Sequence, residues 1–119
     1  MKITEKIIML GLVFFLIHCS SDNEEDLLPN NNDRCKENTA TLSENIIPII
    51  NQNCAISGCH VSGTGRVDLS VKENIIQNAT QIRTFTQSGF MPPSDSGRTL
   101  TAAQKENIYC WVENGAQDN

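Results

Sequence analysis

The sequence is poor in side chains that ligate metals or neutralise phosphates. Of its two histidines, His18 lies in an apolar N-terminal stretch, which leaves His60 for the rest of the chain. Of its three methionines, Met1 and Met9 lie in that stretch as well, which leaves Met91. The net charge of −5 offers no basic surface against a row of phosphates, so we exclude a nucleic-acid partner.

Aromatic residues are also scarce, at 5% of the chain. Beyond residue 18 they are Phe85, Phe90, Tyr109 and Trp111. A unit of roughly 75–80 residues is marginal with a hydrophobic core alone, and such units usually add a staple or a cofactor. A large, flat, apolar cofactor would supply part of that core. No strand-like alternation stands out either, which predicts an all-α fold.

The first 18 residues have the pattern of a secretory signal peptide. A short basic start precedes an apolar run over 7–17, about eleven residues, which is too short to span a core of about 30 Å as a helix. The run ends in Leu16-Ile17-His18-Cys19, which resembles a bacterial lipobox with His18 in place of the usual small residue. We therefore expect a lipoprotein signal peptide over 1–18 and lipidation of Cys19. An ordinary signal peptide cleaved elsewhere is the alternative.

An acidic and polar stretch over 19–40 is predicted to be a tether. Its acidic run over 22–26, directly behind Cys19, is similar to the surface-export signal of some Gram-negative lipoproteins, although a solvated spacer has the same composition. The low-complexity part over 27–33 is predicted to be unstructured. The expected location is the cell envelope, as an outer-membrane lipoprotein held by its lipid and facing the periplasm or the cell surface. Exported cysteines can be oxidised there.

Two cysteines and a histidine form the most specific motif of the chain. Cys54 and Cys59 are separated by four residues, and His60 follows directly. The usual c-type haem attachment signature has two residues between its cysteines, and the spacing here is a rarer, longer variant. The thiols add to two vinyl groups along one porphyrin edge, and the histidine must follow at once to reach the iron. The two extra residues can bulge outward, and Gly58 can adopt the backbone angles that such a turn needs.

Met91 is the predicted partner of His60 on the iron. A haem with two histidine ligands is excluded because the exported chain has only one, and the cysteines lack the paired knuckles of zinc sites. Pro92 and Pro93 follow Met91 and stiffen a loop that can hold a thioether against the far face of a haem. Taken alone, a methionine in such a turn is more often simply buried. The haem motif beside it favours the ligand interpretation.

Cys35 and Cys110 lie just outside the two ends of the predicted helical part, and we expect a disulfide between them. Of the five cysteines, one is assigned to lipid and two to haem, which leaves this pair. The closed loop of about 75 residues would stabilise the fold by on the order of 4 kcal/mol in the chain-entropy model. A Cys54–Cys59 disulfide is the competing possibility and belongs to a form without haem.

The first and last predicted helices begin at capping-box spacings, Thr41 with Glu44 and Thr101 with Gln104. The first spans 42–53, or begins slightly later so that Pro48 lies in its first turn. The last ends at 114–115, an Asn-Gly pair. The predicted inward faces are Ile46, Ile49, Ile50 and Asn53 in the first helix, and Ile108, Trp111 and Val112 in the last.

Two shorter helices are predicted between them, over 71–78 and 79–87. Their inward residues are Val71 and Ile75 in one, and Ile82 and Phe85 in the other. Small and Gly-rich residues over 61–66 predict a loop after the histidine, and 88–99 is predicted to be the loop that carries Met91.

This order of parts resembles the monohaem class I cytochrome c domain, particularly the small domains of exported bacterial lipoproteins. Those domains carry Ile-x-Pro-Ile before the first cysteine and end in a Trp-x-x-x-Gly-Ala helix, as residues 46–49 and 111–116 do here. The resemblance covers residues 42–117. It implies a cytochrome c-like domain over 41–117, wrapped around one covalent haem c, with the first and last helices crossing near one haem edge.

The resemblance implies an electron carrier. Cys54 and Cys59 would hold the haem, and His60 and Met91 would fill both axial positions, leaving no open position for a substrate. The expected partner is another redox protein of the envelope. Two other classes stay open: an interaction module without haem, held by two disulfides, and a haem enzyme from which Met91 is displaced. For the enzyme, Arg83 and Arg98 are the only polar residues that the sequence suggests could assist catalysis at the haem.

Overall fold

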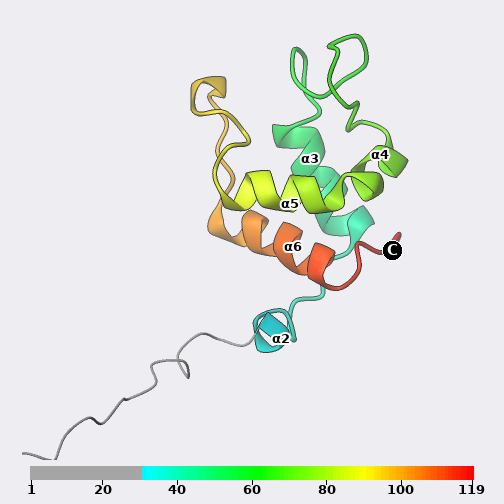
Figure 1. Ribbon diagram of the computed structural model, residues 1–119, viewed down its shortest axis with the longest axis vertical. Helices are drawn as coiled ribbons and strands as arrows, with labels where there is room; N and C mark the ends of the chain where they lie inside the picture. Colours follow the sequence, from blue (N-terminus) through cyan, green and yellow to red (C-terminus); the bar gives the residue numbers. More distant parts are fainter. Residues whose placement is uncertain (1–30) are drawn as a thin grey trace, which may run out of the picture.

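Helices α5 (Ala79–Gln87) and α6 (Ala102–Glu113) pack side by side, and the short helix η2 (Leu42–Ile46) also packs against α6 (Figure 1). The computed structural model describes residues 31–119, so the predicted signal peptide, Cys19 and the tether up to residue 30 lie outside the described residues. The regular elements within residues 31–119 are all helices, with no strand among them, which confirms the all-α class. The other elements are α2 (Asn31–Arg34), α3 (Ile47–Asn53), α4 (Lys72–Gln77) and η3 (Ser94–Ser96).

The first predicted helix is divided in two near Pro48. η2 is a π-helical turn that runs directly into α3, a regular helix with Pro48 in its first turn. Thr41 caps η2: its hydroxyl accepts from the Glu44 amide at 3.2 Å, and its own amide donates to the Asn45 side chain at 2.9 Å. In the predicted capping box, the Glu44 side chain would accept the hydrogen bond from the Thr41 amide. In the structure, the Asn45 side chain accepts it instead.

The core lies between η2, α3, α4, α5 and α6. Its most deeply buried large apolar side chains are Leu42, Ile46, Ile50, Ile75, Ile108 and Trp111. Each aliphatic one contributes about 1.5–3 kcal/mol through removal from water. The predicted inward faces of the first and last helices are confirmed, and so is the Thr101–Gln104 capping box of α6. The prediction for Val71 is wrong: this residue is 42% exposed because it is the extended N-cap before α4, where helical periodicity has not yet begun.

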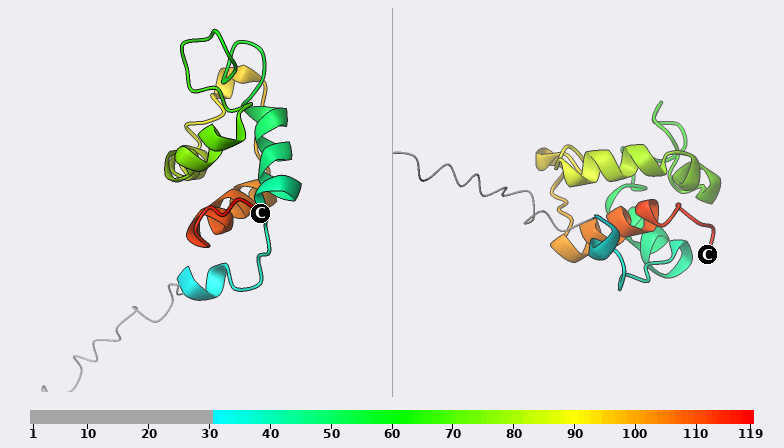
Figure 2. Two further views of the ribbon diagram at one scale, coloured as in Figure 1. Left: turned by 90° about the vertical axis from the view of Figure 1, so that its right-hand side faces the viewer. Right: turned by 60° about the horizontal axis from the view of Figure 1, so that its bottom comes forward.

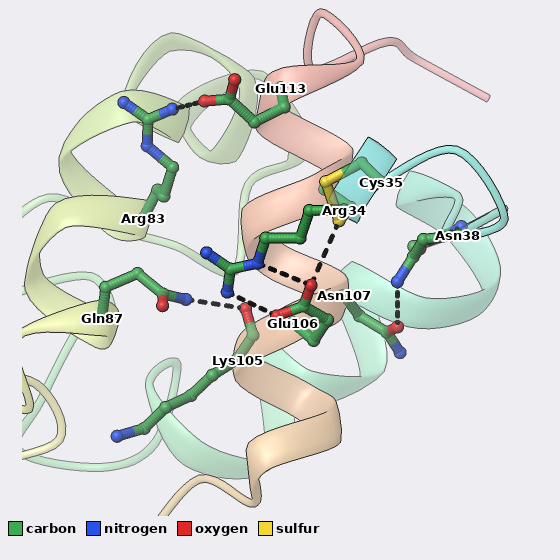
Figure 3. The surroundings of a disulfide bond; sticks show 11 residues. Arg34, Cys35, Asn38, Arg83, Gln87, Lys105, Glu106, Asn107 and Glu113 are labelled. Carbon is green, nitrogen blue, oxygen red and sulfur yellow. Dashed lines mark hydrogen bonds and ion pairs between the residues drawn. A yellow bond between two sulfur atoms is a disulfide. The ribbon is translucent and has the colours of Figure 1, made fainter. Parts of the chain in front are cut away.

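The segment before η2 is fastened to α6, although the sequence predicted a tether over these residues. The predicted Cys35–Cys110 disulfide is present, with Cα atoms 5.2 Å apart and both residues buried (Figure 3). Beside it, Arg34 Nε donates to Glu106 at 2.9 Å. The folded domain therefore includes α2 and the chain up to residue 40, as well as the predicted range 41–117.

The last two residues also belong to the fold. Asn119 accepts hydrogen bonds from the amides of Leu42 and Ser43, both at 2.9 Å, and Lys72 forms an ion pair with Asp118 at 2.7 Å. The first amides of a helix have no partner within the helix, so these bonds satisfy donors at the start of η2.

The domain has two distinct ends. Figure 1 and the left view of Figure 2 agree in placing α2 at one end, beside α6, and the loops over 55–70 and 88–98 at the other. The point where the N-terminal segment enters the domain is therefore remote from these loops. None of the helices within residues 31–119 has the length and hydropathy required to cross a membrane.

Candidate functional site

A cavity of about 290 Å³ lies between the loop that follows α3, helix α5 and the loop that follows α5. The four residues assigned to the haem all line it: Cys54, Cys59, His60 and Met91. Most of the lining surface is apolar, with side chains such as Leu69, Ile82, Phe85 and Pro92. Small-molecule sites in proteins enclose about 300–1,000 Å³, and the volume of this cavity is just below that range. Because it is open on one side, its ligand can extend beyond the enclosed volume.

The segment from Cys54 to His60 forms a closed loop at the end of α3. The Cys54 amide donates to Ile50 at 2.8 Å, which continues the helical pattern, and the His60 amide donates back to the Cys54 carbonyl at 3.0 Å. Between them, the Cys59 amide donates to Ile56 at 2.9 Å, and Gly58 has a φ of +80°. This is the φ of the third residue of a type II turn, a position that favours glycine. The extra residues of the long motif are thus absorbed in a turn, with Gly58 in the conformation expected for it.

The two thiols of the motif are unpaired in the structure, and they differ in exposure. Cys54 is buried, with 8% of its surface exposed, whereas Cys59 is half-buried. Burial raises the pKa of the Cys54 thiol to about 11, and the neighbouring Cys59 adds to that rise. Cys54 is therefore a neutral thiol around neutral pH, and neither sulfur is in a disulfide.

The imidazole of His60 is held by the backbone of the same loop. Its Nδ1 lies 3.1 Å from the carbonyl oxygen of Val67. A carbonyl oxygen only accepts, so this contact requires the hydrogen on Nδ1, and in the neutral tautomer with that hydrogen the lone pair lies on Nε2. Histidines that ligate metals usually donate their second ring N–H to such a partner, which fixes the tautomer and the ring orientation. The Leu69 amide also donates to the His60 carbonyl at 3.0 Å, so hydrogen bonds hold both the ring and the backbone of His60.

Met91 enters the cavity from the loop after α5. Its amide donates to the Phe85 carbonyl at 3.1 Å, which ties the start of this loop to the last turns of α5. Pro92 and Pro93 also line the cavity, and the Met91–Pro92 peptide bond is cis. The neighbouring Phe90 is exposed, with its ring 5.2 Å from that of Phe85. The backbone of the loop thus places the single thioether of the described domain at the cavity.

The polar residues of the cavity are not those that the sequence suggested. Arg83 pairs with Glu113 of α6, and Arg98 donates to the Gln52 carbonyl at 3.1 Å; neither of these arginines lines the cavity. Arg66 does line it, and it lies in the Gly-rich loop, where no periodicity marks a residue as inward. The other polar lining residues are Asn53, Asn78, Gln81, Thr86 and Ser96.

The remaining predicted site residues lie elsewhere. The disulfide joins Cys35, directly after α2, to Cys110 within α6, and Cys19 lies outside the described residues. Figure 1 shows α2 at the end of the domain remote from the loops. The structure therefore separates four cysteines into a structural pair and a pair of free thiols at a cavity. Comparison with protein-family models, with curated proteins and with solved structures finds no match to this chain.

Proposed function

We propose that this chain carries one covalent haem c and acts as an electron carrier of the cell envelope. The observation that carries the proposal is the shared cavity: two unpaired thiols, an imidazole held through Nδ1 and a thioether all line it. They come from two loops, and backbone hydrogen bonds hold each loop in place.

The residues of the cavity fit such a group. Cys54 and Cys59 would form the two thioether bonds, and His60 and Met91 would ligate the iron. The mainly apolar lining suits a flat macrocycle, and Arg66 is a cation that can offset cofactor carboxylates. The bound haem would supply one-electron chemistry, as its iron cycles between Fe(II) and Fe(III).

Electron transfer follows from the ligand set. With an imidazole and a thioether on the iron, no position is open to a substrate, and a thioether raises the potential relative to a second imidazole. A peroxidase-like activity requires Met91 to leave and a polar group to assist on that side. The sequence candidates for that help, Arg83 and Arg98, are engaged outside the cavity.

The remaining parts of the proposal concern the fold family and the location. The helical order, with η2 packed against α6, is the arrangement expected of a small class I cytochrome c domain. The lipid at Cys19 would hold the protein on the outer membrane, and an envelope redox protein would exchange electrons with it. The described chain begins with α2, at the end remote from the loops that line the cavity, which supports this arrangement.

A lipoprotein interaction module without haem is the second candidate. The Cys35–Cys110 disulfide fits it, because a disulfide alone can stabilise a domain of this size. That candidate also pairs Cys54 with Cys59, whereas both thiols are free in the structure. The free thiols therefore favour the haem proposal.

The test is expression of the full chain together with the machinery for c-type haem attachment. We expect one covalently retained haem per chain by intact mass and a reduced pyridine spectrum of c type. Cys54→Ser and Cys59→Ser should each keep at most one thioether bond, while Cys35→Ser should keep both. A colourless wild-type protein of unmodified mass, with its Cys35–Cys110 disulfide intact, would overturn the proposal in favour of the interaction module.

A further inference from the structure

The chain that follows His60 turns back, and two adjacent residues, Arg66 and Val67, form hydrogen bonds with the attachment loop. The Arg66 Nη1 atom donates to the Gly58 carbonyl at 2.8 Å. The carbonyl of Val67, the residue that follows Arg66, accepts from the His60 ring. Gly65, with a φ of +73°, allows the reversal immediately before Arg66.

Gly58 is one of the four residues between the two cysteines, where the common signature has two. It is the third residue of the 56–59 turn, and Ser57 and Gly58 are both exposed. An exposed turn has no hydrophobic packing to hold it, so its position depends on its hydrogen bonds. A guanidinium is a charged donor, and charge-assisted bonds are stronger than neutral ones.

The Arg66 guanidinium is free for this role. The ion pairs within residues 31–119 use Arg34, Lys72 and Arg83 as their cations. Arg66 is also the one arginine that lines the cavity among the described residues. Its side chain therefore lies at the cavity while it holds the carbonyl next to Cys59.

We propose that Arg66 is the positioning residue of the long attachment motif: by holding the Gly58 carbonyl, it fixes the 56–59 turn and keeps the Cys59 thiol at the cavity. The role of the thiols in this statement rests on the proposed haem function. The order of the loop does not, because it belongs to the chain without any cofactor.

Hydrogen exchange on the cofactor-free full chain tests the proposal first. We expect Arg66→Met to raise the exchange rate of the Cys59 and His60 amides about fivefold, which corresponds to about 1 kcal/mol of lost hydrogen-bond energy. Gly58→Ala disturbs the same turn by another route and should raise the same rates. Arg98→Met is the matched control, because Arg98 also donates to a backbone carbonyl but lies outside the cavity lining, and it should leave these rates unchanged.

Haem attachment is the second readout. After maturation and thiol alkylation, Arg66→Met should show a larger share of chains with one thioether and one alkylated thiol, and Arg66→Lys should recover part of the double attachment. If wild type takes up no haem, the proposed function fails, but the exchange data still decide the role of Arg66. Unchanged exchange in Arg66→Met overturns the inference, and a defect confined to the haem-loaded protein would assign Arg66 to the cofactor carboxylates instead.

Discussion

Arg34 and Glu106 are 72 positions apart in the sequence, yet Arg34 Nε donates to Glu106 Oε1 at 2.9 Å (Figure 3). The same guanidinium lies over the ring of Tyr109, 3.8 Å from its centroid. This contact holds α2 on α6 next to the disulfide. The pair lowers the pKa of Glu106, first through the hydrogen bond to Arg34, and raises the pKa of Arg34 through the same bond.

We expect Glu106→Gln to reduce the acid sensitivity of the fold. A carboxylate whose pKa is lowered in the folded state stabilises it above the ordinary pKa, and this contribution is lost as the pH falls through the lowered value. Both partners are about one-third exposed, so the coupling should be only about 0.5–1 kcal/mol in a double-mutant cycle with Arg34→Met. Urea unfolding between about pH 7 and pH 3 measures it. The control is Glu113→Gln, which breaks another ion pair of α6; equal pH profiles for wild type and Glu106→Gln would contradict the prediction.

The disulfide should contribute more than this ion pair. It closes 75 residues, and removing it through Cys35→Ser should lower the free energy of unfolding by about 2–4 kcal/mol. Cys110→Ser and the double variant should give about the same loss, since each removes the same bond. Urea denaturation of the three proteins provides the comparison. Losses that add in the double variant would show that the serines, and not the missing bond, cause the effect.

Helix positions and the buried faces were predictable because they depend on local spacing. The faces of Ile46 and Ile50, and of Ile108 and Trp111, follow from the 3.6-residue period, and all four residues are buried. The prediction for Val71 failed one residue before its helix begins. The short helix α2 carried no usable periodicity, because docking on α6 holds it in place rather than its own sequence.

The candidate site was predictable only in its chemically distinctive side chains. Cys54, Cys59, His60 and Met91 could be selected because these residue types are rare in the chain. The Val67 carbonyl that fixes the imidazole is a backbone atom, and any residue type could supply it. Arg66 acts through one hydrogen bond across the loop, which leaves no pattern in the sequence.

Met91→His should distinguish the proposed ligand from a bystander in the haem-loaded protein. An imidazole in place of the thioether should keep the iron six-coordinate and lower the reduction potential by on the order of 0.1 V, a small part of the about 0.8 V that axial ligands span. Met91→Ala should instead leave the sixth position to solvent and change the optical spectrum. Redox titration and absorption spectra measure both. An unchanged spectrum and potential in Met91→Ala would mean that Met91 does not ligate the iron.

In the haem-free chain, the two thiols of the motif should differ strongly in reactivity. A thiol reacts as its thiolate, and the rise in the pKa of Cys54 from 9.0 to about 11 lowers its thiolate fraction around pH 8 about a hundredfold. Burial also restricts access to Cys54, whereas Cys59 is half-buried. We therefore expect iodoacetamide to modify Cys59 at least about tenfold faster, as measured by peptide mapping over time.

Two controls make this reactivity difference interpretable. In urea both thiols should react at similar rates, because unfolding exposes Cys54 and restores its ordinary pKa. After haem attachment neither should react, since both sulfurs would be in thioether bonds. Equal rates in the folded, haem-free chain would place Cys54 outside the buried position that it occupies at the end of α3. Loss of both thiols without haem would reveal the Cys54–Cys59 disulfide of the competing interaction module.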